Sequence, residues 1–350
     1  MPSTQIIGWF ADIGLHDRPE VGGKGGSLGE LQRAGIDVPP GFVVKTGAFE
    51  RFIQSLEQES PVRARVESVD PDDLAAVQAC CSELRARVEA SQLPRDVLDE
   101  ISAAHATLCA QPGEAPVAVR SSATTEDAVD ASFAGLQDTY LWVTELAQTL
   151  ERVRSCWASL YSVESVTYRR KKGLPEAGVA MGVVVQRMVN ARTAGVMFTR
   201  SPVTGDRSVI TVEGSWGLGS AVVGGEVTPD RWVIGKITGE IPVREVSEKL
   251  IQHLPASGGG IESVAVPDDL RRTPCLSDAE LQALRAIGRN VERHYGRAQD
   301  IEWAVERDTQ RILLLQSRPE TVWSAKEAAP VARPAADPLS HVMSIFGGRR

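Results

Sequence analysis

The segment 300–319, DIEWAVERDTQRILLLQSRP, constrains the fold more than any other because its pattern fits a β-hairpin. Apolar residues alternate with polar or small ones over 301–306, which is the period of a half-buried strand. A polar break at 308–310 separates this run from a second apolar strand core at 312–315. The segment therefore predicts two antiparallel strands joined by a three-residue loop.

The predicted register gathers three polar side chains on one face of this hairpin. With 308–310 as the loop, Glu302 lies opposite Gln316, about 5 Å away. Arg318 follows on the same face two residues later. A carboxylate, an amide oxygen and a guanidinium in this arrangement suit a hard cation and a phosphate group. The alternative is a solvated strand face that carries an ordinary Glu–Arg pair.

A glycine-rich segment near the amino end, VGGKGGSLGE at 21–30, is the second candidate for phosphate binding. It predicts a loop that enters a helix, with Ser27 and Glu30 as a capping box and Gly35 as the helix end. Backbone N–H groups at such a helix start, together with the cation of Lys24, would bind phosphate. The spacing is not that of a Walker A loop. A flexible turn with a solvated lysine is the competing interpretation.

The third candidate for phosphate binding is the segment 117–135, VAVRSSATTEDAVDASFAG. It predicts a strand at 117–119 that ends at Arg120, followed by a run of hydroxyl, carboxylate and small residues that closes at 132–135. An arginine with several short donors suits phosphate oxygens. A polar loop that caps the next element is the alternative. The strand predicted at 137–143 contains Thr139.

The rest of the chain is expected to contain both helices and strands. Periodicity and capping residues predict helices at 46–53, 70–89, 94–110, 145–174 and 277–295. Further strands are expected at 42–45, 183–186, 194–199, 209–213 and 232–235. The glycine pattern after the strand at 209–213 is not GxGxxG, so no Rossmann fold is inferred.

Composition limits the functional classes. The chain has 350 residues, 42% of them hydrophobic, and a formal charge of −8. It is long enough for two or three lobes, and its charge argues against a nucleic-acid partner. Five cysteines without a CxxC pair predict reduced thiols and a cytoplasmic location. We expect no membrane partner, because no apolar run has transmembrane length and no signal peptide is recognisable.

Six segments in order resemble one enzyme family. These are GGKGGSLGEL, AVRSSATTEDAVDASFAG, VVVQRMV, GVMFTRSPVTGD, EGSWGLG and DIEWA…LLQSRPET. Together, over roughly residues 8–323, they resemble the nucleotide-binding domain of the pyruvate phosphate dikinase and phosphoenolpyruvate synthase family. The resemblance implies an α+β, ATP-grasp-like fold that holds ATP between two lobes, here 1–188 and 189–324. The Ala/Pro-rich segment 325–350 is expected to be a loose tail whose apolar cluster 342–346 docks on a partner.

The resemblance also implies roles for individual residues. Three cations, Lys24, Arg120 and Arg318, would hold the ATP phosphates and act in catalysis. A phosphate cover would include Ser132, Gly135 and Thr139. Gln186 would lie in the adenine pocket at the lobe junction, and Glu213 would reach the ribose or adenine side. Glu302 and Gln316 would bind Mg²⁺, and Mn²⁺ would suit the same ligands.

The resemblance further implies that a phosphoryl acceptor is needed. Family members that act alone carry a histidine in a Gly-rich Thr-Ser-His setting, and none of the histidines here has one: His16, His105, His253, His294 and His341. We therefore expect a separate partner subunit to carry the phosphorylated histidine and a small molecule to be the final acceptor.

The split subunits of phenylphosphate synthase, which converts phenol and ATP to phenyl phosphate, AMP and phosphate, offer the most specific parallel. Alternatives are the ATP-binding part of a phosphoenolpyruvate synthase (pyruvate, water dikinase) or related split phosphotransferase, and a non-catalytic nucleotide-sensing module. A stand-alone rifampin-type phosphotransferase would need the missing histidine domain.

Overall fold

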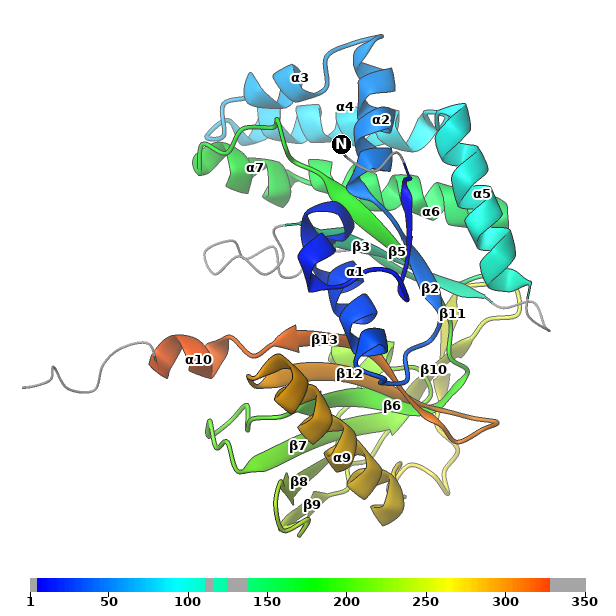
Figure 1. The fold of residues 1–350 in the computed structure, drawn as a ribbon, viewed down its shortest axis with the longest axis vertical. Coiled ribbons are helices and arrows are strands. Elements are labelled where there is room, and N and C mark those ends of the chain that lie inside the picture. Colours follow the sequence, from blue (N-terminus) through cyan, green and yellow to red (C-terminus); the bar gives the residue numbers. More distant parts are fainter. Residues whose placement is uncertain (1–4, 111–115, 125–137, 328–350) are drawn as a thin grey trace, which may run out of the picture.

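Two antiparallel sheets face each other and together position the site (Figure 1). The computed structural model describes residues 5–110, 116–124 and 138–327. The first sheet has the strand order β1-β2-β5-β3-β4 and the second the order β13-β12-β6-β7-β8-β9, while β10 and β11 form a separate hairpin. A short connection at 188–190 joins β5 of the first sheet to β6 of the second.

The strands of the first sheet are β1 (Ile7–Trp9), β2 (Gly41–Val44), β3 (Val117–Ala123), β4 (Thr139–Val143) and β5 (Met181–Arg187). Those of the second sheet are β6 (Ala191–Phe198), β7 (Val209–Trp216), β8 (Asp230–Gly235), β9 (Val243–Glu245), β12 (Gln299–Glu306) and β13 (Ile312–Pro319). The separate hairpin consists of β10 (Ile251–Pro255) and β11 (Ile261–Ala265). All these pairings are antiparallel, so an α+β rather than an α/β architecture results.

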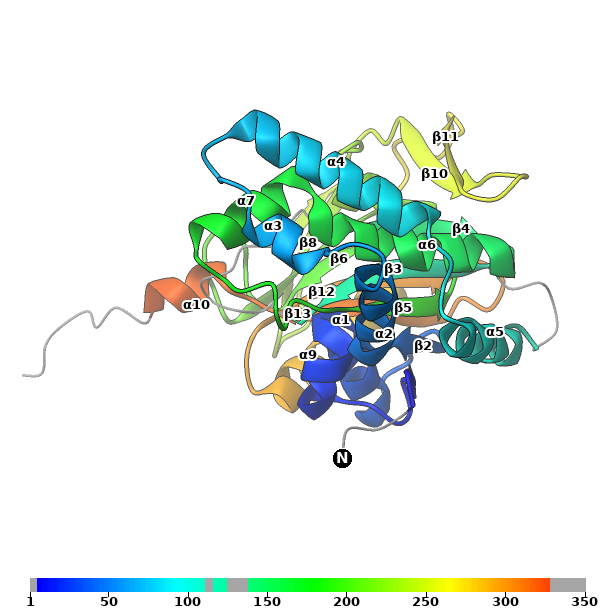
Figure 2. The ribbon, with the colours of Figure 1, turned by 90° about the horizontal axis from the view of Figure 1, so that it is seen from above.

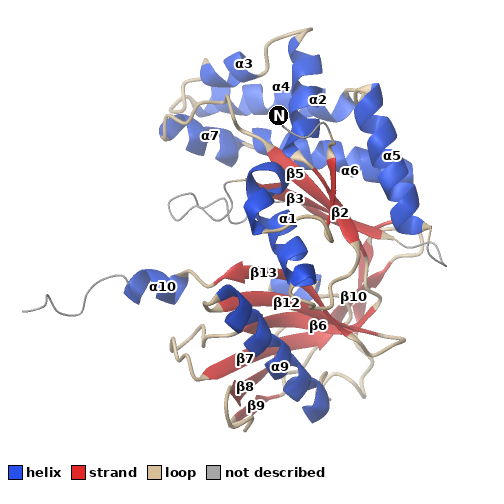
Figure 3. Cartoon of the chain, in the orientation of Figure 1, coloured by secondary structure: helices blue, strands red, loops and turns tan. Residues whose placement is uncertain are grey.

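Helices cover the first sheet on the side away from the second, as the blue ribbons of Figure 3 show. They are α2 (Thr46–Glu57), α3 (Arg63–Glu67), α4 (Leu74–Ala90), α5 (Arg95–Cys109), α6 (Leu146–Ala158) and α7 (Val163–Lys171), with the 3₁₀ turn η2 (Ser159–Tyr161). The remaining helical segments are η1 (Leu15–Asp17), α1 (Arg18–Arg33), α8 (Ser220–Val223), α9 (Asp278–Tyr295) and α10 (Val322–Glu327). The long helix predicted at 145–174 is thus broken into three pieces.

Helix α9 packs on the outer face of the second sheet (Figure 1). The predicted capping box is present, since Ser277 and Glu280 bond to each other's backbone N–H groups. Gly296, with φ 66°, ends the helix in the left-handed conformation that glycine adopts without steric cost. The helix buries Leu281, Leu284 and Val291 against this face, so the opposite face of the sheet is left to form the site.

The β12–β13 hairpin confirms the predicted pairing of Glu302 with Gln316, although its loop is longer than predicted. Glu306 N donates to Arg311 O, and the loop consists of the four residues 307–310 rather than three. Between the Glu302–Gln316 and Trp303–Leu314 pairs, β13 carries one extra residue, Leu315. This β-bulge offsets the longer loop and restores the predicted register.

The glycine-rich segment is not the exposed loop that the sequence predicts. Residues 21–30 lie inside α1 and most are buried, with one kink at Gly22 (φ 73°). A side chain at Gly22 would overlap the carbonyl of Ser122, and one at Gly29 would overlap that of Ile13. The glycines therefore allow close packing of a helix rather than the exposure of N–H groups, because a Cβ would not fit at the contact.

The predicted helix start at Ser27 is also wrong. The Ser27 hydroxyl donates to the carbonyl of Ser317 in β13. The Glu30 carboxylate lies 2.7 Å from His294 Nε2 in α9 and accepts from Leu15 N. These side chains serve tertiary contacts, and α1 thereby bridges the first sheet and the hairpin of the second.

Trp303 should contribute strongly to stability because its side chain is fully buried between the second sheet and α9, with Gly214 directly against its ring. Trp303→Ala is expected to lower the free energy of unfolding by about 3–5 kcal/mol, measured by urea titration. Ile237→Ala, at a side chain that is 88% exposed, is the control and should change it little. A loss as small as the control's would show that this core is not the one described.

Candidate functional site

A cavity of about 800 Å³ lies between the two sheets, a volume typical of sites for small organic ligands. Strands β3, β4 and β5 of the first sheet form one wall, and β6, β12 and β13 of the second form the other. The β10–β11 hairpin, which projects beside β4 and α6 in Figure 2, closes one end together with α8. The site thus combines elements far apart in the sequence.

Arg120 crosses this cavity from the first sheet to the second. Its Nη1 donates to Leu315 O at 3.0 Å, and its Nη2 donates to Glu302 Oε2 at 3.2 Å and to Gln316 Oε1. The accepting carbonyl belongs to the bulged residue of β13. The Arg120 Nε is buried and has no hydrogen-bond partner in the described part of the chain. The guanidinium is therefore held at the hairpin through Nη1 and Nη2, while its Nε–H group makes no hydrogen bond within the described residues.

The strand around Arg120 is longer than predicted. Strand β3 continues to Ala123, because Ser121 and Ser122 pair with β5. The Ser122 hydroxyl donates to Val21 O at 2.8 Å and accepts from Gly25 N. It therefore binds the backbone of α1 and is not a donor held ready for phosphate.

Lys24 lies beside this strand rather than in a loop. Its side chain is 7% exposed, and its Nζ donates to Ser121 O at 3.0 Å, one residue from Arg120. One helical turn later, Ser27 contacts β13. Lys24 is thus placed close to Arg120 and the hairpin, although it does not line the cavity described above.

Glu302 and Gln316 are suited to a hard cation. Their side-chain oxygens converge on a single positively charged nitrogen, Arg120 Nη2, so both reach one point. Mg²⁺ prefers oxygen ligands and commonly uses one or two protein groups with phosphate oxygens and water. The described residues contain no group of three His, Cys, Asp or Glu side chains arranged for a metal. Any Mg²⁺ here would therefore depend on the ligand for further coordination.

Gln186 and Thr139 line the same cavity. Gln186 pairs with Ala118 on β3, its side chain is buried, and its Nε2 donates to Pro39 O. Thr139 pairs with Arg120 in the β3–β4 ladder. Ser132 and Gly135 lie outside the described residues.

Glu213 lies on β7 of the second sheet. Both Glu213 and Glu302 pair with Val196, so the two carboxylates are on the same face, two strands apart. Burial raises the pKa of Glu213, and Arg231, 3.9 Å away, counteracts this. Its side chain does not line the cavity, so a contact with the ribose or adenine stays a prediction.

Comparison with known proteins identifies the family. The pyruvate phosphate dikinase, AMP/ATP-binding domain matches residues 18–337. The chain belongs to this family. Phosphoenolpyruvate synthase of Pyrococcus furiosus is 35% identical over 368 residues, covering 94% of this chain and 45% of the relative. A probable phosphoenolpyruvate synthase of Archaeoglobus fulgidus is 42% identical over 314 residues, covering 89% of this chain and 41% of the relative.

Rifampicin phosphotransferase of a Streptomyces species is 43% identical over 321 residues, covering 91% of this chain and 36% of the relative. The chain spans less than half the length of these three relatives. Family membership confirms the predicted ATP-grasp-like fold and a nucleotide-binding role. Within the described ranges, no helix is long and apolar enough to cross a membrane.

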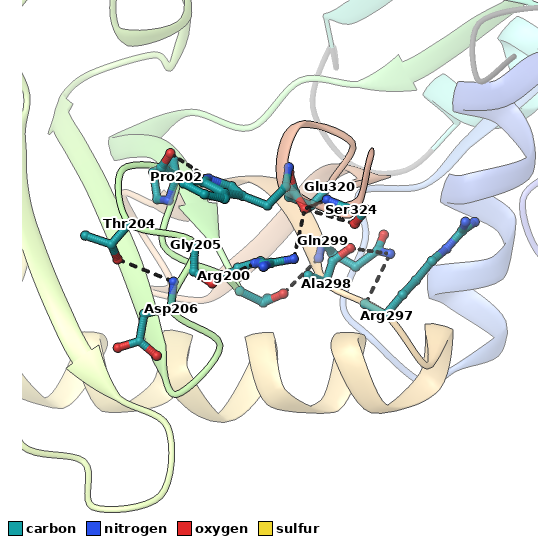
Figure 4. Close-up of polar contacts among 12 residues, drawn as sticks. Arg200, Pro202, Thr204, Gly205, Asp206, Arg297, Ala298, Gln299, Glu320 and Ser324 are labelled. Carbon is teal, nitrogen blue, oxygen red and sulfur yellow. Dashed lines mark hydrogen bonds and ion pairs between the residues drawn. The ribbon is translucent and has the colours of Figure 1, made fainter. Parts of the chain in front are cut away.

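The segment that follows the β12–β13 hairpin makes contacts with the turn after β6 that the sequence did not predict. Glu320 follows β13, and its carboxylate accepts from Trp323 N and Ser324 N at the start of α10 (Figure 4). Arg200 Nη1 lies 3.8 Å from this carboxylate, and Trp323 Nε1 donates to Pro202 O. The turn after β6 thus anchors the segment that leaves the hairpin.

Asp300 is a second residue that sequence reasoning missed. Its Oδ2 lies 3.3 Å from Arg318 Nε, so the predicted phosphate-facing arginine is paired across the hairpin. Burial raises the pKa of Asp300 to about 6, while the Arg318 charge works in the opposite direction. The alternation Asp300–Glu302–Ala304 on one strand face was the signal that could have found it.

The raised pKa of Asp300 predicts that the free energy of unfolding depends on pH. Because the folded state holds this proton more tightly than the unfolded state, the stabilisation is complete below about pH 4 and is lost as pH rises through about 6. The loss should be about 3 kcal/mol. Urea unfolding of wild type and Asp300→Asn at several pH values measures it as the difference between the two proteins. Arg318→Gln should extend the decline to higher pH, and a pH-independent difference would contradict the assignment.

Proposed function

We propose that the chain binds ATP with Mg²⁺ in the cavity between the sheets and serves as the ATP-binding part of a dikinase-type phosphotransferase. The observation that carries the proposal is the reach of Arg120 across the cavity to Glu302 and Gln316. A cation from one lobe and oxygen ligands from the other meet there at one end of a ligand-sized space. A magnesium triphosphate needs both kinds of group at the same place.

The orientation of ATP follows from how the lining differs along the cavity. Arg120 and Glu302 meet where the two sheets approach each other, whereas Met188, Leu218 and Ile261 contribute an apolar surface to the lining, which also includes Arg152 and Arg187. The triphosphate would lie beside Arg120 and Glu302, and the base beside the apolar surface, near Gln186. Arg318 and Thr139 would then complete the phosphate contacts, with Ser132 and Gly135 as further contributors.

The chemistry needed is positioning and charge neutralisation, since phosphoryl transfer requires little covalent participation by the protein. Bound Mg²⁺, held by Glu302 and Gln316, would supply neutralisation of the phosphate oxygens. Lys24, Arg120 and Arg318 would fix the triphosphate and stabilise the charge that develops during transfer. Arg120 would release one or both hairpin acceptors to the metal and turn its donors, including the unused Nε, toward phosphate.

The similar proteins favour one acceptor class over another. They are phosphoenolpyruvate synthases and a rifampicin phosphotransferase, which supports the phosphoenolpyruvate synthase-type alternative better than the specific expectation of phenylphosphate synthase. We therefore place the chain in a reaction that uses ATP to phosphorylate a histidine and yields AMP and free phosphate, so that one of the two phosphoryl groups removed from ATP stays on the histidine and the other is released to water. We propose that this histidine is carried by a separate partner subunit.

The metal assignment predicts the effect of Glu302→Gln. Loss of the carboxylate should reduce the Mg²⁺-dependent part of ATP affinity by about tenfold or more, because even indirect supports of a metal ligand are worth that much. Calorimetric titration of ATP with and without Mg²⁺ measures it, with urea unfolding as the check on folding. Glu83→Gln, on an exposed helix face, is the matched control. Equal Mg²⁺ dependence in wild type and Glu302→Gln would remove Glu302 from the metal site.

Phosphoryl transfer has its own test. The chain is mixed with a purified histidine-domain protein of the family and ATP labelled at the β or γ phosphate. We expect AMP formation and an acid-labile label on the partner, both lost in Arg120→Ala. ATP binding without AMP formation for any such partner would instead favour a nucleotide-sensing module. Labelling of this chain alone would contradict transfer to a separate subunit.

A further inference from the structure

Trp142 has a backbone conformation that a large side chain rarely adopts. Its φ is 56°, in the left-handed region, and Gln310 (φ 57°) is the one other non-glycine residue with positive φ in the described ranges. Such a conformation is uncommon for a bulky residue, and it persists where the surroundings enforce it, often at a binding site. Trp142 therefore needs an explanation beyond the strand to which it belongs.

A β-bulge explains where this conformation comes from. Val117 pairs with Val143 and Val119 pairs with Tyr140, so β4 carries one residue more than β3 over this interval. An extra residue bends the strand and redirects side chains. Trp142 lines the cavity as a result and packs against the apolar cluster there, together with Met188 and Ile261.

The β10–β11 hairpin holds the bulge in place. Gly260 N, in the loop of this hairpin, donates to Trp142 O at 2.9 Å. In the middle of β10 the hairpin is joined to the second lobe, since Leu218 N donates to His253 O and Ser220 Oγ lies 2.8 Å from His253 Nδ1. Trp142 is thus fixed from both lobes at the end of the cavity that the hairpin closes.

Trp142 lies away from Arg120 by a distance that suits a nucleotide. Thr139 pairs with Arg120, and Trp142 follows three residues later on the same strand, about 10 Å along it. Arg120 and Trp142 are therefore separated by roughly the length of a ribose with part of a triphosphate. A planar ring bound at the apolar end would meet an indole there.

We propose that Trp142 is the residue against which the base of the nucleotide packs, and that it makes the site prefer a base-bearing triphosphate to a bare one. This inference rests on the proposed function, because it assumes the triphosphate at Arg120. Aromatic side chains bind bases through ring contact, and the strained backbone is the means by which the fold directs Trp142 to this wall.

The experiment compares two ligands, ATP and inorganic tripolyphosphate, by calorimetric titration with Mg²⁺. In Trp142→Asn, ATP affinity should fall by about tenfold while tripolyphosphate affinity stays within about twofold of wild type. Trp142→Phe should keep most of the preference for ATP. Asn tolerates the left-handed conformation, so the first variant should fold, and thermal unfolding checks this.

Gln310→Asn is the matched control for backbone strain, because it makes the same kind of change at the other left-handed position, outside the lining of this cavity. It should leave the affinity ratio of the two ligands unchanged. Equal ATP affinity in wild type and Trp142→Asn, or an equal loss for both ligands, would overturn the role of Trp142. Failure of the wild type to bind ATP would instead overturn the proposed function itself.

Discussion

The contact between the Arg120 guanidinium and the β12–β13 hairpin is the interaction on which the site depends. A buried arginine is costly unless its donors are matched, and here the acceptors come from the other lobe: a carboxylate, a side-chain amide and the carbonyl of a bulged residue. These hydrogen bonds join the two sheets at the cavity. The same oxygens are the ones that a hard cation would take, so a bound metal and Arg120 compete for them.

Helix α1 makes this arrangement possible from the other side. Its glycines lie against backbone and small side chains where a Cβ would not fit, which brings the helix close to β3. From there the Ser27 hydroxyl donates to the carbonyl of Ser317 in the hairpin. The backbone carbonyl of Asp37, just after the helix, accepts from Leu314 N of β13. Lys24 is placed at the residue next to Arg120 as a consequence of this packing, and α1 contacts both the first sheet and the β12–β13 hairpin.

The two ends of the cavity differ in how they are built. The part around Arg120 and Glu302 is formed by long strands, with β-bulges at Leu315 and in the β3–β4 ladder. The apolar end is formed by a linker, the short helix α8, and a hairpin that contacts both lobes. Regular strands fix the positions of charged groups well, whereas the irregular end offers shape and an aromatic wall. The proposed phosphate contacts and the proposed base contact therefore lie on different kinds of structure.

The sequence by itself determined the features that depend on near neighbours. The hairpin and the Glu302–Gln316 pair could be predicted because alternation and a turn fix which residues oppose each other, and the Ser277 capping box because its partner is three residues away. Only the tertiary structure decided what the glycines at 21–30 and the hydroxyls of Ser122 and Ser27 contact. Their partners lie on other strands and helices, distant in sequence, and no local period reports such contacts. The same holds for Trp142, whose direction is set by a bulge opposite β3 and a hairpin more than a hundred residues later.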